Sequence, residues 1–124
     1  MFVVLGATGN TGGATARALL AQGQQVRVVL RNEEKAGLWQ QMGAEVFLSD
    51  YKDRSRLTEA VRGSQGVYLM NPPPDHQPDP FLATREQAEI YRGLIDLTPR
   101  VIVLSSVGAH RRLGTGSIQT LHLL

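Results

Sequence analysis

The stretch MFVVLGATGNTGG, residues 1–13, contains the pattern that decides the predicted fold. Its aliphatic run Phe2–Leu5 is rich in β-branched and aromatic residues, as buried strands are. Four glycines follow within eight residues, and apolar residues at helical spacing begin at about Asn10. The order of strand, glycine-rich turn and helix is the context in which backbone amides at a helix N-terminus bind a phosphate group.

The glycines fall at Gly6, Gly9 and Gly12, so their spacing is G-x-x-G-x-x-G and differs from the standard dinucleotide fingerprint G-x-G-x-x-G. We expect Gly6 to let the chain turn away from the strand and Gly12 to let the helix pack closely against it. Gly9 would admit a diphosphate, because a Cβ there would hold the phosphates away. Polar side chains of the same turn are further candidates for binding: Thr8, Asn10 and Thr11. The alternative is a tight turn that binds no ligand.

The rest of the chain alternates short aliphatic runs with segments of helical periodicity. Four further runs are predicted strands: Val26–Leu30, Glu45–Leu48, Gly66–Met70 and Val101–Leu104. Helices are predicted at about residues 10–22, 53–62 and 81–97. The last of these carries its apolar residues at helical spacing, at Ala88, Tyr91, Leu94 and Ile95. A further, shorter helix between the second and third strands would pack onto the sheet through Trp39.

Strands joined by helices pair in parallel through crossover connections, and these connections are nearly always right-handed. The sequence therefore predicts an α/β fold with a doubly wound parallel sheet of about five strands. The length of 124 residues, of which 42% are hydrophobic, is enough for one domain with its own core.

Composition argues against several classes of protein and of site. The 13 basic and 11 acidic residues give a formal net charge of +2, and their scattered order favours a solvated surface over nucleic-acid binding. No run approaches the roughly 20 apolar residues of a membrane helix, and no signal peptide precedes the first strand, so we expect a cytoplasmic protein. The chain has no cysteine, which excludes disulfides and thiolate metal sites. The three histidines have no ligand spacing, so no metal site is predicted at His76, His110 or His122.

A basic residue ends the second predicted strand, where the adenine ribose of a dinucleotide would lie. Arg31 stands at this position, and Lys35 follows four residues later. A guanidinium group holds a 2′-phosphate through charge-assisted hydrogen bonds, whereas an NAD site usually offers a carboxylate to the 2′-hydroxyl. We therefore expect NADP(H) to be preferred over NAD(H). Alternatively, Arg31 is a surface residue at a strand end that is attracted to Glu33 or Glu34.

Four segments together resemble one family of proteins. GATGNTGG after the first strand, VRVVLRNEEKA across the second, GAEVFLSDYKDRSRLTEAVRGSQGVYLM through the third and fourth, and VIVLSSVGAH at the fifth are similar to the NmrA-like branch of the atypical short-chain dehydrogenase/reductases. The resemblance runs in order over almost the whole chain. It implies a Rossmann domain that binds NADP(H) and that spans residues 1–124.

The resemblance also implies roles for residues that follow the later strands. Asp50 and Tyr51, after the third strand, would form the adenine wall, although Asp50 also fits a turn or a helix N-terminal position. Asn71 and Pro72 would lie along the cofactor near the nicotinamide ribose. Ser105, after the fifth strand, resembles the serine of the wider superfamily and is the candidate catalytic residue. Ligands in such sheets bind beyond the carboxyl ends of the strands, so these positions would converge on one crevice.

Two departures from the family leave the activity open. The Tyr-x-x-x-Lys pair of the superfamily is absent, because no tyrosine of the chain is followed by a lysine at that spacing. The chain is also shorter than the family and stops inside a helix that is expected to begin near Ser117. We therefore expect either a truncated protein that lacks the family's substrate region or a fragment of a longer one.

Three functions fit these observations. The first is an NADP(H)-binding domain of an oxidoreductase that acts on a small carbonyl or quinone, with Ser105 or water as the proton source. The second is a non-catalytic NADP(H)-binding redox sensor that acts through a regulatory protein partner. The third is an interaction module that has lost the cofactor. No nucleic-acid or membrane partner is expected, and the sequence does not define the oligomeric state.

Overall fold

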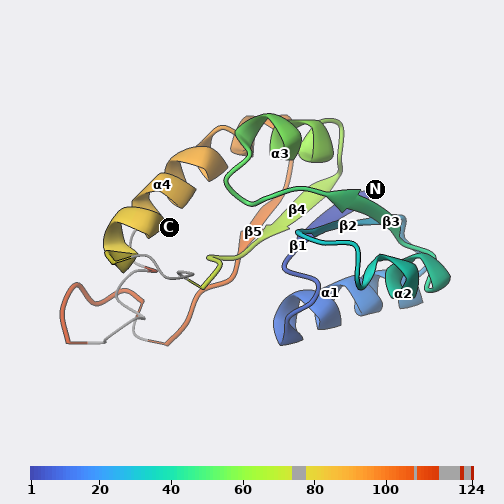
Figure 1. Ribbon diagram of the computed structural model, residues 1–124, viewed down its shortest axis with the longest axis horizontal. Coiled ribbons are helices and arrows are strands. Elements are labelled where there is room, and N and C mark those ends of the chain that lie inside the picture. Colours follow the sequence, from blue (N-terminus) through green and yellow to red (C-terminus); the bar gives the residue numbers. More distant parts are fainter. Residues whose placement is uncertain (74–77, 108, 115–120, 122–123) are drawn as a thin grey trace.

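In the computed structural model, five parallel strands form one sheet in the order β3-β2-β1-β4-β5 (Figure 1). The strands are β1 (Phe2–Leu5), β2 (Val26–Leu30), β3 (Glu45–Leu48), β4 (Gly66–Leu69) and β5 (Val101–Val103). All five predicted strands are therefore confirmed, with β4 and β5 each one residue shorter than expected. The chain winds outward from β1 to β3 and then returns to β4 on the other side of β1. The strand order thus reverses between β1 and β4, which is where ligands bind in open α/β sheets.

The structure describes residues 1–73, 78–107, 109–114, 121 and 124. Three positions discussed above, His76, Ser117 and His122, lie outside the described residues.

Two pairs of helices cover opposite faces of the sheet (Figure 1). The helices α1 (Asn10–Ala21) and α2 (Ala36–Gln41) lie on one face, and α3 (Arg54–Val61) and α4 (Pro80–Arg92) lie on the other. The predicted Rossmann-like, doubly wound α/β fold is confirmed by this arrangement.

Successive strand residues contribute to separate cores on the two faces, as the two-residue period of a strand requires. Val3 and Val29 pack under α3 and α4, while Val4 and Val28 pack under α1 and α2, and all four side chains are fully buried. Trp39 is 1% exposed and belongs to the second of these cores, which confirms that it packs α2 onto the sheet. Because both faces are covered in this way, the strands are nearly continuous apolar runs.

The last long helix is shorter than predicted. α4 ends at Arg92, Gly93 follows as its C-cap, and a separate 3₁₀ helix spans Ile95–Leu97. The backbone tightens there through bonds three residues apart, from the Gly93 amide to Ile90 and from the Leu94 amide to Tyr91. Ile95 is 48% exposed as a result, so its predicted place on the apolar face of one continuous helix is wrong.

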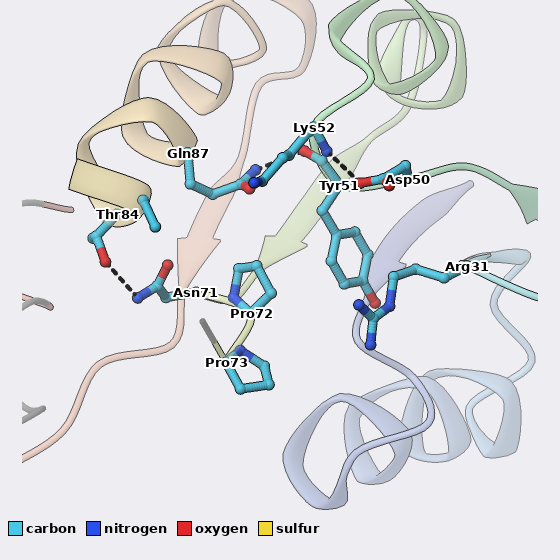
Figure 2. A pocket seen from close by; sticks show the side chains of 10 residues that line it. Arg31, Asp50, Tyr51, Lys52, Asn71, Pro72, Pro73, Thr84 and Gln87 are labelled. Atoms are coloured by element: carbon cyan, nitrogen blue, oxygen red, sulfur yellow. Dashed lines mark hydrogen bonds between the residues drawn. The ribbon is translucent and has the colours of Figure 1, made fainter. Parts of the chain in front are cut away.

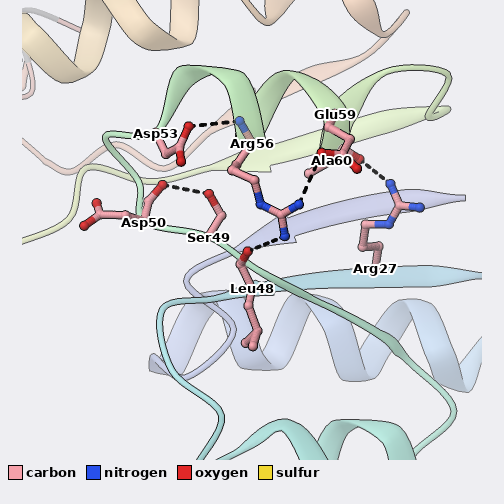
Figure 3. A network of polar contacts seen from close by, with 8 residues as sticks. All are labelled: Arg27, Leu48, Ser49, Asp50, Asp53, Arg56, Glu59 and Ala60. Atoms are coloured by element: carbon pink, nitrogen blue, oxygen red, sulfur yellow. Dashed lines mark hydrogen bonds and ion pairs between the residues drawn. The ribbon is translucent and has the colours of Figure 1, made fainter.

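Cationic side chains fasten α3 to the edge strand β3 (Figure 3). Arg56 donates to the Leu48 carbonyl at 2.9 Å, and its guanidinium carbon lies 4.3 Å from the centroid of the Phe47 ring. On β2, Arg27 donates to the carbonyl of Ala60 in α3 at 2.7 Å. The bond to the Leu48 carbonyl fixes the start of the turn between β3 and α3, where the predicted site residues Asp50 and Tyr51 lie.

The face that carries α1 is covered less completely near β5. An apolar groove of about 290 Å³ lies there, and its lining includes Leu19 of α1, Tyr68 of β4 and Ile102 of β5. The Tyr68 hydroxyl is buried and has no hydrogen-bond partner in the described part of the chain. Ile102 is 63% exposed. Within the described residues, no helix combines the length and apolar character needed to span a bilayer.

Candidate functional site

The glycine turn between β1 and α1 has the geometry that the sequence predicts for two of its glycines. Gly6 has a positive φ of 69°, a conformation that favours glycine, and its carbonyl accepts a 3.0 Å bond from the Gly9 amide. A Cβ added to Gly12 would lie 2.2 Å from the Gly6 carbonyl oxygen. Gly6 therefore turns the chain and Gly12 allows close packing of α1 on the strand, as expected.

Gly9 is the one glycine of the motif that the fold itself does not require. It is the N-cap of α1 with φ −87° and ψ 173°, an extended conformation that other residues adopt readily. An added Cβ would meet only the Gly6 carbonyl oxygen, at the ordinary contact distance of 3.4 Å. Among the described residues, no side chain makes a capping hydrogen bond at the N-terminus of α1. The first amides of the helix therefore face outward beside three exposed side chains that the sequence singles out, those of Thr8, Asn10 and Thr11.

Sequence reasoning assigned no role to a fourth glycine, Gly13. A Cβ added there would lie 2.8 Å from the Ala7 carbonyl oxygen. Gly12 and Gly13 thus form a bare patch on α1 that rests directly on the backbone of the turn. The signal in the sequence was the pair of adjacent glycines inside a helix, where each costs roughly 1 kcal/mol relative to alanine.

A cavity of about 220 Å³ opens beyond the carboxyl ends of β2, β3 and β4 (Figure 2). Its lining brings together five residues that the sequence predicts for a cofactor site: Arg31, Asp50, Tyr51, Asn71 and Pro72. The remaining lining residues are Lys52, Pro73, Ala83, Thr84 and Gln87. Lys35, at the N-cap of α2, is exposed and is not among the described residues that line the cavity.

Tyr51 connects this cavity to the glycine turn. Its side chain is 7% exposed, and its hydroxyl oxygen accepts a 3.1 Å hydrogen bond from the Gly6 amide. The Arg31 guanidinium carbon lies 5.7 Å from the centroid of the Tyr51 ring and reaches toward its hydroxyl end (Figure 2). Burial raises the pKa of the Tyr51 phenol, and the Gly6 amide and the Arg31 charge oppose that rise. The hydroxyl is therefore protonated and neutral at neutral pH.

Asp50 forms a turn, which is one of the two structural alternatives to its predicted contact with the adenine. Its Oδ1 accepts a 2.9 Å bond from the Lys52 amide, and the exposed side chain also lines the cavity. The helix-capping role belongs instead to Asp53, whose Oδ1 accepts from the Arg56 amide at 3.0 Å. The contact of Asp50 and Tyr51 with an adenine ring stays a prediction.

Helix α4 supplies polar side chains to the opposite wall of the cavity. Gln87, 2% exposed, donates from Nε2 to the Tyr51 carbonyl at 2.8 Å. Asn71 donates from Nδ2 to the Thr84 hydroxyl at 3.1 Å, and that hydroxyl donates to the Pro80 carbonyl at 2.9 Å. These bonds hold the loop after β4 and the turn after β3 against the same helix.

The sequence pattern that could have revealed Thr84 and Gln87 is their spacing. They precede Tyr91 at helical intervals, so all three share the buried face of α4. A search for apolar residues passes over the first two because their side chains are polar. Polar residues on the buried face of a helix are satisfied by specific partners, and this requirement was the missed signal.

The first described residues after β5, 104–107, are not among those that line the cavity. Ser105 and Ser106 are exposed, and neither is among the described residues that line it. His110 is also exposed. The role of Ser105 as a catalytic residue therefore stays a prediction. Within the described ranges, no group of three or more His, Cys, Asp or Glu side chains is arranged to hold a metal ion.

Comparisons with solved structures place the fold among reductases. The triphenylmethane reductase of Citrobacter sp., complexed with NADP(H), aligns with a TM-score of 0.78 and 24% identity over 99% of this chain and 43% of its own. An NADPH-dependent quinone oxidoreductase from Escherichia coli, complexed with NADPH, aligns with a TM-score of 0.78 and 22% identity over 99% of this chain and 42% of its own.

Sequence comparison identifies the family. The NmrA-like family domain-containing oxidoreductase himF of Aspergillus japonicus is 36% identical over 97 residues, which are 76% of this chain and 28% of that protein. The chain thus spans less than half the length of each of these three relatives. The sequence model of the NmrA-like family matches residues 1–96. Since this match covers most of the chain and includes the glycine turn, the chain belongs to the NmrA-like family.

Proposed function

We propose that the chain is the NADP(H)-binding domain of an oxidoreductase that acts on a small carbonyl or quinone. The observation that carries the proposal is the hydrogen bond between the Tyr51 hydroxyl and the Gly6 amide. It connects the glycine turn to Tyr51, which lines the same cavity as Arg31, so the start of α1 and a guanidinium group lie on either side of one tyrosine. A dinucleotide presents a diphosphate and a ribose phosphate to these two kinds of donor.

The residues present fit such a ligand. Gly9 leaves space above the uncapped end of α1, where unpaired amides and the helix dipole favour negative charge. Arg31 adds a fixed positive charge at the end of β2, and Lys52 lines the same cavity. A carboxylate at position 31 would repel a 2′-phosphate, and the residue there is an arginine. The preference for NADP(H) over NAD(H) rests on this guanidinium group.

The relatives support the chemistry. Both structural relatives were crystallised with NADP(H) or NADPH, one is a quinone oxidoreductase, and himF is named an oxidoreductase. A bound nicotinamide supplies or accepts a hydride. This chain's residues would bind and orient the coenzyme: the α1 amides would hold its diphosphate, and Asn71, which lines the cavity, would lie near the nicotinamide ribose, as the family resemblance implies.

A second candidate is a redox sensor that binds NADP(H) without turning it over and reports to a protein partner. Two observations favour it. The chain has no Tyr-x-x-x-Lys pair, and Ser105 is exposed outside the described cavity lining. Without a positioned acid, hydride transfer to a carbonyl lacks its proton donor.

Calorimetric titration with NADPH and NADH, followed by a quinone-reduction assay, separates these functions. Binding with turnover supports the oxidoreductase, and binding without turnover supports the sensor. Binding of neither nucleotide would refute both.

The preference for NADP(H) has its own test in Arg31→Asp. We expect NADPH affinity to fall at least roughly tenfold, the scale of a charge-assisted hydrogen bond, with little change for NADH. Arg62→Asp is the control, because it makes the same change of charge at an exposed residue, the C-cap of α3, that does not line the cavity. Equal losses for NADPH and NADH would show that Arg31 does not recognise the 2′-phosphate.

A further inference from the structure

We propose that Tyr51 is a positioning residue: its hydroxyl holds the Gly6 peptide in the orientation that presents the glycine turn to the coenzyme, and its ring supports Arg31. The affinity part of this proposal rests on the proposed function, whereas the effect on Gly6 does not. Both backbone polar groups of Gly6, its N–H and its carbonyl, have hydrogen-bond partners.

The Gly6 amide is buried, and the Tyr51 hydroxyl accepts its hydrogen bond at 3.1 Å from a residue 45 positions away. The Gly6 carbonyl accepts the Gly9 amide at 3.0 Å and would contact any Cβ on Gly12. The N–H belongs to the Leu5–Gly6 peptide and the carbonyl to the Gly6–Ala7 peptide, so a rotation of either unit would break one of these bonds and disturb the turn that leads to the N-cap of α1. Without the hydroxyl, a buried amide loses its partner, and proteins rarely leave such a group unsatisfied.

Tyr51 is itself held from a different direction. Its backbone carbonyl accepts the bond from Gln87 Nε2 at 2.8 Å, and Gln87 is 2% exposed on α4. The tyrosine therefore spans the site from the helix on one face of the sheet to the turn at the start of α1. The Arg31 guanidinium carbon lies 5.7 Å from the ring centroid, so the same ring supports the side chain proposed to bind the 2′-phosphate.

The chain offers matched controls for this one hydroxyl. Tyr68 lies on β4, and its buried hydroxyl has no partner among the described residues. Tyr68→Phe makes the same chemical change without breaking a hydrogen bond. Thr98→Val removes a buried 3.2 Å bond from the Thr98 hydroxyl to the Ser64 carbonyl, at the amino ends of β4 and β5. This second variant loses one buried bond at the sheet edge opposite the site.

The test is Tyr51→Phe in the full chain, which keeps the ring and removes the hydroxyl. Calorimetry with NADPH and with NADH is expected to show affinities lower by roughly 5- to 30-fold, equally for both, because both carry the diphosphate. Exchange of the Gly6 amide hydrogen, followed by NMR, is expected to accelerate by about tenfold or more. Tyr68→Phe and Thr98→Val should leave both nucleotide affinities within about twofold of wild type.

The outcomes separate this proposal from the proposed function. Unchanged Gly6 exchange in Tyr51→Phe would overturn it, and so would faster exchange with unchanged affinity for a nucleotide that the wild type binds. If the wild type binds neither nucleotide, the proposed function fails, while Gly6 exchange still decides whether Tyr51 holds the turn. If Tyr51→Phe does not fold, Gln87→Met removes the donor to the Tyr51 carbonyl, and an unchanged Gly6 rate in that variant would overturn the proposal.

Discussion

Replacing Gly12 by alanine is expected to destabilise the protein, although it places a better helix former inside α1. The new Cβ would lie 2.2 Å from the Gly6 carbonyl oxygen and 3.0 Å from that of Leu5. Both oxygens belong to the backbone of β1 and its turn, so no side chain can rotate out of the way. Ordinary contact distances are restored only if the helix moves from the strand by on the order of 1 Å.

Two opposing terms set the magnitude. Alanine gains up to about 1 kcal/mol over glycine inside a helix. Overpacking costs about 1–3 kcal/mol, and an obstacle made of backbone places Gly12 at the upper end of that range. The core beneath α1, which includes the fully buried Ala16, would be displaced with the helix. We expect a net loss of about 2 kcal/mol in the free energy of unfolding.

Urea denaturation followed by circular dichroism measures this loss as a lower midpoint at an unchanged slope. Gly37→Ala is the matched control, because Gly37 also lies in a helix and an added Cβ there meets nothing within 4 Å. That variant should gain roughly 0.5–1 kcal/mol. A Gly12→Ala protein as stable as the wild type, beside a stabilised Gly37→Ala protein, would refute the packing argument.

Two further predictions concern the N-cap residues of α1 and α3. Gly9→Ala should cost about 1 kcal/mol of stability or less, because its Cβ has room, but should weaken NADPH binding about tenfold in calorimetry by filling the space above the α1 amides. Comparable losses of stability in Gly9→Ala and Gly12→Ala would contradict the distinction between them. Asp53→Ala should lower the free energy of unfolding by about 1 kcal/mol through loss of the α3 cap, whereas Asp53→Asn keeps the capping oxygen and should stay near wild type in the same urea experiment.

The sequence predicted the parts of the fold that depend on local pattern. Runs such as Phe2–Leu5 are strands because β-branched side chains fit a sheet that is buried on both faces. Gly6 and Gly12 could be assigned because a turn off a strand and a close helix contact each require a missing Cβ. The end of α4 was placed too late, because Gly93 and the tightened turn after it interrupt a periodicity that continues in the sequence.

The sequence predicted only those site residues whose positions follow from the ends of the strands or from the family resemblance. Arg31 was found because it ends a strand, whereas Asn71 was implied by the family resemblance; both line one cavity because strand ends meet at one edge of a parallel sheet. The contacts of Thr84 and Gln87 with that edge depend on how α4 lies across it, which no local pattern contains. The hydrogen bond that the Tyr51 hydroxyl accepts from the Gly6 amide was missed for the same reason. An aromatic residue after a strand predicts burial, but it does not predict which group its hydroxyl will contact.

The separation in sequence between Gly6, Tyr51 and Gln87 has a consequence for how the protein is made. The bonds that join them cross 45 and 36 residues, so the glycine turn is completed only after α4 has been synthesised. Parallel sheets already fold slowly, since distant segments must meet before any contact forms. A nascent chain would therefore complete the proposed nucleotide site only after α4 has been made. Coenzyme in the cell would stabilise finished molecules by mass action and leave growing ones dependent on their own packing.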